Sequence, residues 1–274
     1  MRDVAFGQYY PTDSFIHRLD PRTKLLASIV YIVAIFLCVD YYGYAVCFAF
    51  LVMMILVSRI PVKSVLKTVK AVLFVVLVTV VINVLFYSDG NPYWEWWVIR
   101  ITDAGLIFAS KMAMRLIFLV IATSLVTLTT TPMNLTDGLE SLMTPLKLIR
   151  FPVHDVAIIM SIALRFIPSF IEEIDKIMMA QKARGAAFDN GGLIKRAKAL
   201  LPVLIPLFVS AFRRADELAM ALDARCYNAT DKRTKMKKLT LTWRDAVAAL
   251  ATAIFLAAVI LLKIGFFGLL PVIP

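Results

Sequence analysis

Side chains that hold metals or carry out catalysis are scarce in this sequence. Its 274 residues include only two histidines, His17 and His154, and three cysteines. Because a metal site needs several such side chains at short spacing, we expect no metal site and no cofactor held by this chain itself. The motifs HExxH and GxSxG do not occur, and the apolar runs contain no paired acidic residues. The sequence therefore argues against an intramembrane enzyme, and no catalytic residue is predicted.

Acidic residues are also few, because 19 Asp and Glu oppose 30 Lys and Arg, giving a net charge of +11. Such an excess of base is typical of nucleic-acid binding or of membrane proteins with basic cytoplasmic loops. Hydrophobic residues make up 61% of the chain and the mean hydropathy is +0.81, more apolar than a soluble domain. No nucleic-acid motif occurs. We therefore predict an all-α polytopic membrane protein, with the lipid bilayer and no nucleic acid among its partners.

A cleaved signal peptide is not expected, because residues 1–24 carry charge throughout and lack an apolar core with a cleavage site. The odd number of cysteines, without a spacing framework, favours free thiols. Cys38 and Cys47 flank a short turn, so a disulfide between them stays open as an alternative, whereas Cys226 lies far along the chain.

Five apolar runs approach the length of about 20 residues that a membrane-spanning helix needs. They comprise residues 25–39, 44–58, 71–87, 104–131 and 246–262. Of the 30 Lys and Arg residues, 26 fall in segments 1–24, 59–70 and 132–245. The positive-inside rule therefore predicts a multi-pass protein of the cell membrane with a cytoplasmic N-terminus and an extracytoplasmic C-terminus.

The predicted organisation has four parts: a cytoplasmic N-terminal segment (1–24), four transmembrane helices (25–131), a cytoplasmic or membrane-surface region (132–245) and a last transmembrane helix (246–274). The third part is predicted to hold a short amphipathic helix and two long helices, 154–184 and 193–225. Both long helices are apolar in their first halves and charged in their second halves, and they contain Pro168, Pro202 and Pro206. A further partial membrane insertion here stays open.

Some charged residues have two interpretations. Lys111 and Arg115 lie one turn apart in the fourth apolar run, where a charge is costly and often functional; we favour the alternative that both side chains extend to the outer interface. Arg165, Glu172 and Glu173 are expected to form ion pairs along the exposed face of the first long helix.

A short sequence occurs twice in the long helices. IDKIMMAQKARGAAFD, residues 174–189, returns as ADELAMALDARCYNATD, residues 215–231, with matching residues 41 positions apart. The matched pairs are Asp175 and Asp216, Met179 and Met220, Ala180 and Ala221, Ala183 and Ala224, and Arg184 and Arg225. Each arginine stands where its helix is predicted to end.

Capping and docking both explain these arginines. As a cap, arginine in the last turn opposes the negative end of the helix dipole, and Gly185 adopts the left-handed conformation that ends the helix. Cys226 replaces this glycine in the second copy, so Asn228 would have to provide the cap. Capping does not explain why aspartate, methionine and alanine recur in register. We therefore favour docking, with small alanines allowing close approach of a partner.

The sequence HRLDPRTKLL precedes the first apolar run. Asp20 is predicted to be an N-cap and Pro21 the first helical residue, while Arg22 and Lys24 mark the cytoplasmic entrance of the first span.

The paired helix ends, the apolar spans and the HRLDPRTKLL segment resemble the transmembrane coupling (T) component, EcfT, of energy-coupling-factor (ECF) transporters over the whole chain. The resemblance implies a subunit without chemistry of its own, in which 132–245 is a coupling region. It implies that two ABC-type ATPase subunits bind ATP and receive the two motifs, and that a small membrane S component captures a vitamin or similar micronutrient. Carried over, the ATPase-binding residues are Ala183, Arg184, Gly185, Ala224, Arg225 and Cys226.

Two other functions fit less directly. A T component dedicated to a cobalt or nickel ECF transporter would carry the same motifs. A stand-alone channel or secondary transporter would show repeats among the spans and spans broken by glycine or proline. Here the repeat lies outside the predicted spans, which disfavours that class.

Overall fold

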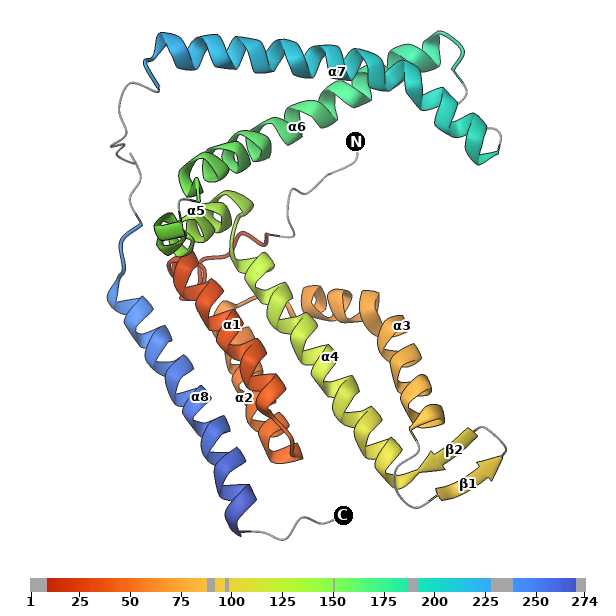
Figure 1. The fold of residues 1–274 in the computed structure, drawn as a ribbon, viewed down its shortest axis with the longest axis vertical. Coiled ribbons are helices and arrows are strands. Elements are labelled where there is room, and N and C mark those ends of the chain that lie inside the picture. The colour runs from red at the N-terminus through yellow and green to blue at the C-terminus, as the bar shows by residue number, and fades with distance from the viewer. Residues whose placement is uncertain are drawn as a thin grey trace. The chain divides into compact units, whose positions relative to one another are not determined.

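The computed structural model describes residues 9–87, 92–96, 99–149, 151–186, 192–227 and 239–269, which form mainly helices (Figure 1). The helices are α1 (Pro21–Leu37), α2 (Tyr41–Ser58), α3 (Val62–Phe86), α4 (Asp103–Thr129), α5 (Pro132–Leu142), η1 (Thr144–Ile149, a 3-10 helix), α6 (Val153–Ala183), α7 (Leu193–Ala224) and α8 (Trp243–Leu269). The predicted all-α class is confirmed. A small antiparallel hairpin of β1 (Pro92–Trp96) and β2 (Ile99–Thr102), which was not predicted, joins α3 to α4.

Five helices among the described residues are long and apolar enough to cross a membrane: α2, α3, α4, α6 and α8. Four of them contain or overlap the predicted runs 44–58, 71–87, 104–131 and 246–262. The remaining predicted run lies on α1, whose 17 residues extend about 25 Å, less than the hydrocarbon thickness of about 30 Å. The fifth helix, α6, lies in the region where the sequence left a further partial membrane insertion open.

The core lies among α1, α2, α4 and α8, and α3 packs on the outer side of α4. Aromatic rings fill its centre. Phe50 of α2 stacks on Phe255 of α8 with ring centroids 4.3 Å apart, and Tyr31 of α1 stacks on Phe255 at 5.5 Å. The Tyr31 hydroxyl donates to the carbonyl of Cys47, so this buried hydroxyl has a hydrogen-bond partner.

The beginning of α1 is joined to the beginning of α8 by Asp245. The predicted cap is confirmed, because the Asp20 carboxylate accepts the Arg22 N–H at 3.0 Å and Pro21 is the first helical residue. Asp245 Oδ1 accepts the Asp20 N–H at 2.8 Å, and its Oδ2 accepts the Thr242 N–H, also at 2.8 Å. One buried carboxylate thus holds together two segments 225 residues apart.

Lys24 makes a second junction at the same end of the bundle. Its buried ammonium donates to the carbonyl of His17 at 3.2 Å, to the carbonyl of Thr129 at 2.9 Å and to the hydroxyl of Thr130 at 3.3 Å. All three donors of this ammonium therefore have acceptors, which is what makes its burial tolerable.

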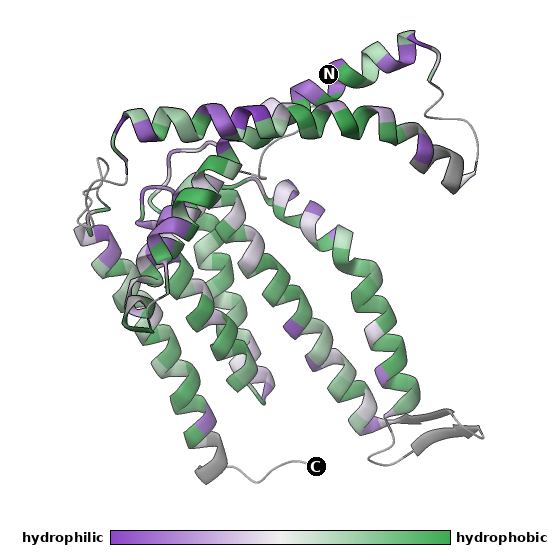
Figure 2. Cartoon of the chain, turned by 45° about the horizontal axis from the view of Figure 1, so that its top comes forward, coloured by the Kyte–Doolittle hydropathy of each residue, from purple (hydrophilic) through white to green (hydrophobic). Residues whose placement is uncertain are grey.

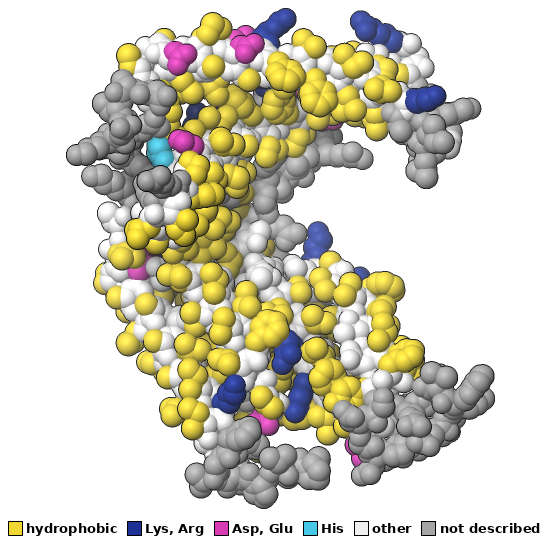
Figure 3. Space-filling view, viewed as in Figure 1, with side chains coloured by type: hydrophobic (Ala, Val, Ile, Leu, Met, Phe, Trp, Pro, Cys, Tyr) yellow, Lys and Arg dark blue, Asp and Glu magenta, His cyan; other side chains and the backbone are white. Residues whose placement is uncertain are grey.

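The outer surfaces of these helices are apolar (Figures 2 and 3). On α1, for example, Leu26, Ile29, Val33 and Phe36 are all about half exposed and follow one helical stripe. On α3, Phe74 is 75% exposed. Apolar side chains in such numbers face lipid or another membrane protein rather than water.

The chain divides into two compact units, residues 1–153 with 239–274, and residues 154–238. α5 belongs to the first unit because it packs against the beginning of α1. A Cβ added to Gly138 would lie 2.9 Å from the Cβ of Pro21, so only glycine permits this approach. These units are defined by compactness. The predicted boundaries at residues 24, 131 and 245 concern location in the membrane or the cytoplasm, and they stay a prediction.

At the other end of the bundle, the sulfurs of Cys38 and Cys47 lie 3.5 Å apart as buried thiols. At this end, two cationic side chains of α4 contact aromatic rings of α1 and α2. The ammonium of Lys111 lies 5.3 Å from the ring centre of Tyr41, and the guanidinium of Arg115 lies 5.3 Å from that of Phe36. Aromatic faces thus partner both cations, and their extension to the membrane interface stays a prediction.

Candidate functional site

The two copies of the repeated sequence form the last turns of α6 and α7. Ala183 is the last residue of α6 and Ala224 the last residue of α7, as the repeat predicted to within one residue. Arg184 and Arg225 therefore begin the turns that follow the helices.

Backbone hydrogen bonds close the end of α6 in three steps. The N–H of Arg184 donates to the carbonyl of Gln181 at 3.1 Å, and the N–H of Gly185 donates to that of Lys182 at 3.0 Å. The N–H of Ala186 reaches back five residues to Gln181 at 3.0 Å. This last bond and the positive φ of Gly185, 88°, are the features of a Schellman cap.

The end of α7 has the same three bonds, each shifted by 41 residues. The N–H of Arg225 donates to Leu222 at 3.2 Å, that of Cys226 donates to Asp223 at 2.9 Å, and that of Tyr227 donates to Leu222 at 3.0 Å. Cys226 has a φ of 52°, so it occupies the left-handed position that Gly185 has in α6. The repeat is therefore a repeat of backbone geometry as well as of sequence.

The residue that ends α7 in the left-handed conformation is Cys226. Asn228 was expected to provide this cap because Cys226 replaces the glycine, and Asn228 lies outside the described residues. Cys226 itself adopts the left-handed conformation, although a side chain with a Cβ does so at a cost of about 1–2 kcal/mol. The second helix end is thus built like the first despite its missing glycine.

Both ends present their side chains outward. All six predicted docking residues are exposed, namely Ala183, Arg184, Gly185, Ala224, Arg225 and Cys226. Within the described part of the chain, neither guanidinium forms an ion pair. Met179 and Met220, one turn earlier, are 64% and 63% exposed. Each end therefore offers one available cation beside an adaptable apolar side chain and small alanines.

α6 and α7 cross each other in opposite directions, as Figure 1 shows. At the crossing, Arg214 of α7 donates to Glu173 at 2.6 Å and to the hydroxyl of Ser169 at 2.6 Å, and its guanidinium lies 5.2 Å from the ring centre of Phe170. Further along α6, the amide of Gln181 donates to the carbonyl of Pro202 at 3.4 Å. Later residues of α6 thus meet earlier residues of α7.

Glu173 was expected to pair with a cation on its own helix, and the structure corrects this expectation. Its partner is Arg214 of the other long helix, because the crossing brings the two side chains together away from the free face. Sequence reasoning missed this contact, although a signal was present. Glu173 and Arg214 are 41 positions apart, the offset of the repeat, because each lies one residue before a copy of the repeat.

The two exposed arginines are equally far from this crossing. Arg184 follows Glu173 by 11 residues, and Arg225 follows Arg214 by 11 residues. At 1.5 Å per residue each helix end lies about 16 Å beyond the ion pair, in opposite directions. An exposed arginine can form two parallel hydrogen bonds to a carboxylate. The arrangement therefore suits two like partners, one at each end, related by approximate two-fold symmetry.

Known proteins are similar in sequence to this chain over almost its full length. Residues 12–236 match the family described as cobalt transport protein. The chain is 48% identical to the ECF transporter transmembrane protein EcfT of Ruminiclostridium cellulolyticum, over 97% of this chain and 100% of that protein. The EcfT of Clostridium kluyveri is also 48% identical, over 96% and 98%, and that of Bacillus subtilis is 40% identical, over 95% and 98%. This chain therefore belongs to the cobalt transport protein family, as a transmembrane component of an ECF transporter.

Proposed function

We propose that this chain is the coupling subunit of an ECF-type importer. In this function, two cytoplasmic ABC-type ATPases bind and hydrolyse ATP, and α6 and α7 transmit their movement to a separate S component that captures a vitamin or similar micronutrient. The observation that carries the proposal is the duplicated helix end, which has the same bonds, the same backbone conformation and the same exposure in both copies.

Duplication favours docking over capping alone. A cap requires only the backbone turn and its left-handed residue. Capping therefore does not explain why Met179 matches Met220 and why the aspartates match in the two copies. Two equivalent surfaces fit two equivalent partners, and a pair of like ATPases meets that requirement. In each docked end, the arginine pairs with an acidic residue of the ATPase and the alanines allow the helix end to approach closely.

The chain itself would hold no cofactor and perform no reaction. ATP would be bound by the partner subunits alone. Among the described residues there is no group of three or more histidine, cysteine and acidic side chains that could hold a metal ion. The multi-pass fold would lie with its N-terminus and residues 132–245 in the cytoplasm, since those segments contain most of the basic residues, and with its C-terminus outside.

A second candidate is a T component dedicated to cobalt or nickel. The description of the matching family as cobalt transport protein supports it. The names of the three relatives given above specify no substrate, and they favour a component of the ECF type in general. Copurification of the S component from native membranes would separate these candidates, because the S component binds the substrate.

The docking proposal is tested with the double substitution Arg184→Ala and Arg225→Ala. Removing a cation from a buried pair typically costs about 2–5 kcal/mol, so the double variant should lose both ATPases in a pull-down and should lose substrate uptake. Each single variant should retain partial assembly, because the second site still holds the complex. Arg213→Ala removes an exposed charge of α7 away from either end and should assemble normally.

Capping alone predicts a different result. Loss of the arginine charge near a helix terminus costs at most about 1 kcal/mol and leaves the complex intact. If the double variant keeps both ATPases and normal uptake, the docking role is wrong. Replacement by lysine adds a further distinction, since lysine keeps the charge but cannot form the two parallel bonds of arginine.

A further inference from the structure

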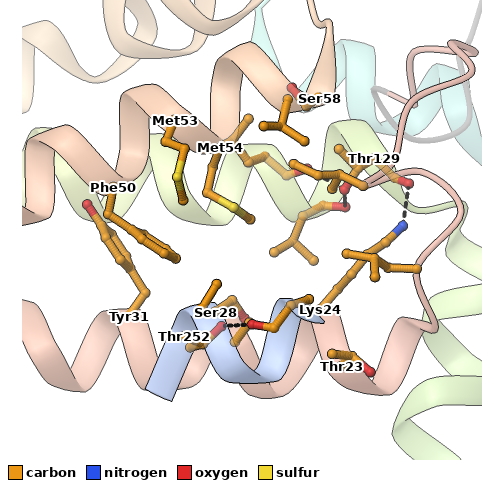
Figure 4. Close-up of a pocket in the computed structure, with 18 of the residues that line it drawn as sticks. Thr23, Lys24, Ser28, Tyr31, Phe50, Met53, Met54, Ser58, Thr129 and Thr252 are labelled. Carbon is orange, nitrogen blue, oxygen red and sulfur yellow. Dashed lines mark hydrogen bonds between the residues drawn. The ribbon is translucent and has the colours of Figure 1, made fainter. Parts of the chain in front are cut away.

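An apolar cavity lies inside the first unit, between α1, α2, α4 and α8 (Figure 4). Its volume is about 270 Å³. Tyr31 and Phe50 lie at one end, Met53 and Met54 line one wall, and Ala251 of α8 lines another. Met53, Val57 and Val247 are also more than 40% exposed on the outer surface, so the cavity is reached from the side of the helices.

Most hydroxyl groups around this cavity already donate a hydrogen bond within the protein. The hydroxyl of Ser28 donates to Leu25, that of Ser58 to Ile55, that of Thr129 to Leu125 and that of Thr252 to Ala248. Lys24 directs its ammonium to the backbone of Thr129. These groups have satisfied their hydrogen bonds within the protein, so the occupant that fits the cavity is a hydrocarbon chain rather than a polar solute.

A basic recess adjoins the cavity at the end of the bundle where α2 ends and α8 begins. It is lined by three arginines, Arg18, Arg59 and Arg244, against one acidic residue, Asp13. Arg18 pairs with Asp13 at 3.4 Å, but both side chains are more than half exposed, so this pair is weak. The recess and the cavity share Phe15 and Val57 as lining residues.

The recess also lies at the expected depth of lipid headgroups. Ser58 and Trp243 are terminal residues of two candidate membrane spans, and Trp243 is 66% exposed beside the recess. Tryptophan is enriched where membrane meets water. The Trp243 ring contacts Phe15 at 6.2 Å and the Arg244 guanidinium at 5.9 Å, so one aromatic ring touches both the apolar and the basic part.

We propose that an anionic phospholipid binds at this end of the bundle, with its phosphate at Arg18, Arg59 and Arg244 and one acyl chain in the cavity. Arginine recognises phosphate oxygens through charge-assisted hydrogen bonds, and basic pockets between transmembrane helices are known to select anionic headgroups. The lipid would bridge the ends of α1, α2 and α8 beside the junction that Asp245 makes.

The experiment is native mass spectrometry of the full chain after removal of copurified lipid. Dioleoylphosphatidylglycerol is added in one series and dioleoylphosphatidylcholine in another, so that only the headgroup charge differs. We expect one bound phosphatidylglycerol that survives mild activation, and weaker binding of phosphatidylcholine. Inorganic phosphate at the same concentration should not displace the lipid, because it lacks the acyl chain; displacement would show an anion site only and would contradict the proposal.

Substitutions separate the headgroup from the chain. Each of Arg18→Gln, Arg59→Gln and Arg244→Gln should weaken binding about fivefold, and the triple variant about 100-fold, from the usual worth of a basic residue at an anionic membrane surface. Lys63→Gln is the matched control, since Lys63 is exposed just after Arg59 but lines neither the cavity nor the recess. A triple variant that binds as tightly as the wild type overturns the headgroup assignment.

The acyl chain is tested by filling the cavity. Ala251→Leu places a larger side chain inside it, and Met53→Trp obstructs it from the exposed side with less risk to folding. Either variant should lower phosphatidylglycerol binding by at least tenfold while unfolding at or above the wild-type temperature. Normal binding by a folded Met53→Trp variant would show that the chain lies elsewhere and would overturn the proposal.

Discussion

Glu173 and Arg214 each lie one residue before a copy of the repeat, and their side chains form an ion pair of 2.6 Å where α6 and α7 cross. Both side chains are less than one-third exposed. The two exposed arginines follow this pair at equal sequence distances. The ion pair therefore marks a point of contact between the two helices that is equally far in sequence from both exposed arginines.

Breaking this pair should loosen the crossing. Glu173→Gln or Arg214→Gln should destabilise the contact by about 1 kcal/mol, since the pair is partly exposed. Spin labels at residues 182 and 223, in a Cys226→Gly background, should report a broader distance distribution in either variant. The charge exchange Glu173→Arg with Arg214→Glu should narrow it again. An unchanged distribution in both single variants would mean that other contacts hold the crossing.

Substitution of the left-handed residue should change the stability of the two helix ends in opposite directions. Cys226→Gly should stabilise the end of α7 by about 1 kcal/mol, and Gly185→Ala should destabilise the end of α6 by a similar amount. A Cβ at Gly185 would meet nothing within 4 Å, so its effect comes from the backbone conformation alone. Hydrogen exchange of the amides of Ala186 and Tyr227 measures both effects. Equal protection in variants and wild type would contradict the described cap.

Asp245 should contribute more to stability than other acidic residues near the bundle end. Asp245→Ala leaves the buried Asp20 N–H without a partner, at a cost of about 1–3 kcal/mol, while exposed Thr242 can bind water. Asp245→Asn keeps one acceptor oxygen and should cost less. Asp13→Ala, at a side chain that is 86% exposed, should change the unfolding temperature little. Similar unfolding temperatures for Asp13→Ala and Asp245→Ala would refute this ranking.

Stability should fall in mild acid because of His17. Its Nε2 donates to the carbonyl of Tyr10 at 3.0 Å and its Nδ1 accepts the hydroxyl of Ser14 at 2.7 Å, so the fold uses the neutral ring. Burial lowers the pKa of His17 from its ordinary value of 6.5. Below pH 6.5 the unfolded chain therefore binds a proton that the folded chain does not. The lost stability grows as the pH falls to the lowered pKa and is constant below it.

Thermal unfolding between pH 7.5 and 5 measures this effect. His17→Gln should remove most of the loss of stability seen between pH 6.5 and 5. A wild-type chain whose unfolding temperature does not change over this interval would exclude the contribution of His17.

Local sequence signals predicted the local features well. Asp20 and Pro21 start α1 as expected, and the last residues of α6 and α7 fall next to the repeated arginines. Four of the apolar runs coincide with span-like helices. These features depend on residues a few positions apart, and capping and hydrophobic periodicity describe such interactions directly.

Contacts between distant segments were not predictable in the same way. Nothing near Asp20 in the sequence indicates that Asp245 accepts its N–H, and the only signal for the pair of Glu173 with Arg214 is the 41-residue offset of the repeat. The left-handed Cys226 was missed for another reason, since propensity disfavours it and the helix end imposes it. The partial membrane insertion that the sequence left open falls on α6, which is long and apolar enough to cross a membrane by length and composition.

The crossing of α6 and α7 divides each helix into a short and a long arm. Residues 173–184 and 214–225 contain neither proline nor glycine, whereas Pro168, Pro202 and Pro206 all lie on the long arms. The short arms are therefore uninterrupted helical segments of about 16 Å, and the long arms extend about 30 Å from the crossing. Because only the long arms contain proline, the long arms can bend where the short arms cannot. A bend at these prolines would change the direction of the apolar first halves of both helices and leave the helix ends before Arg184 and Arg225 unchanged.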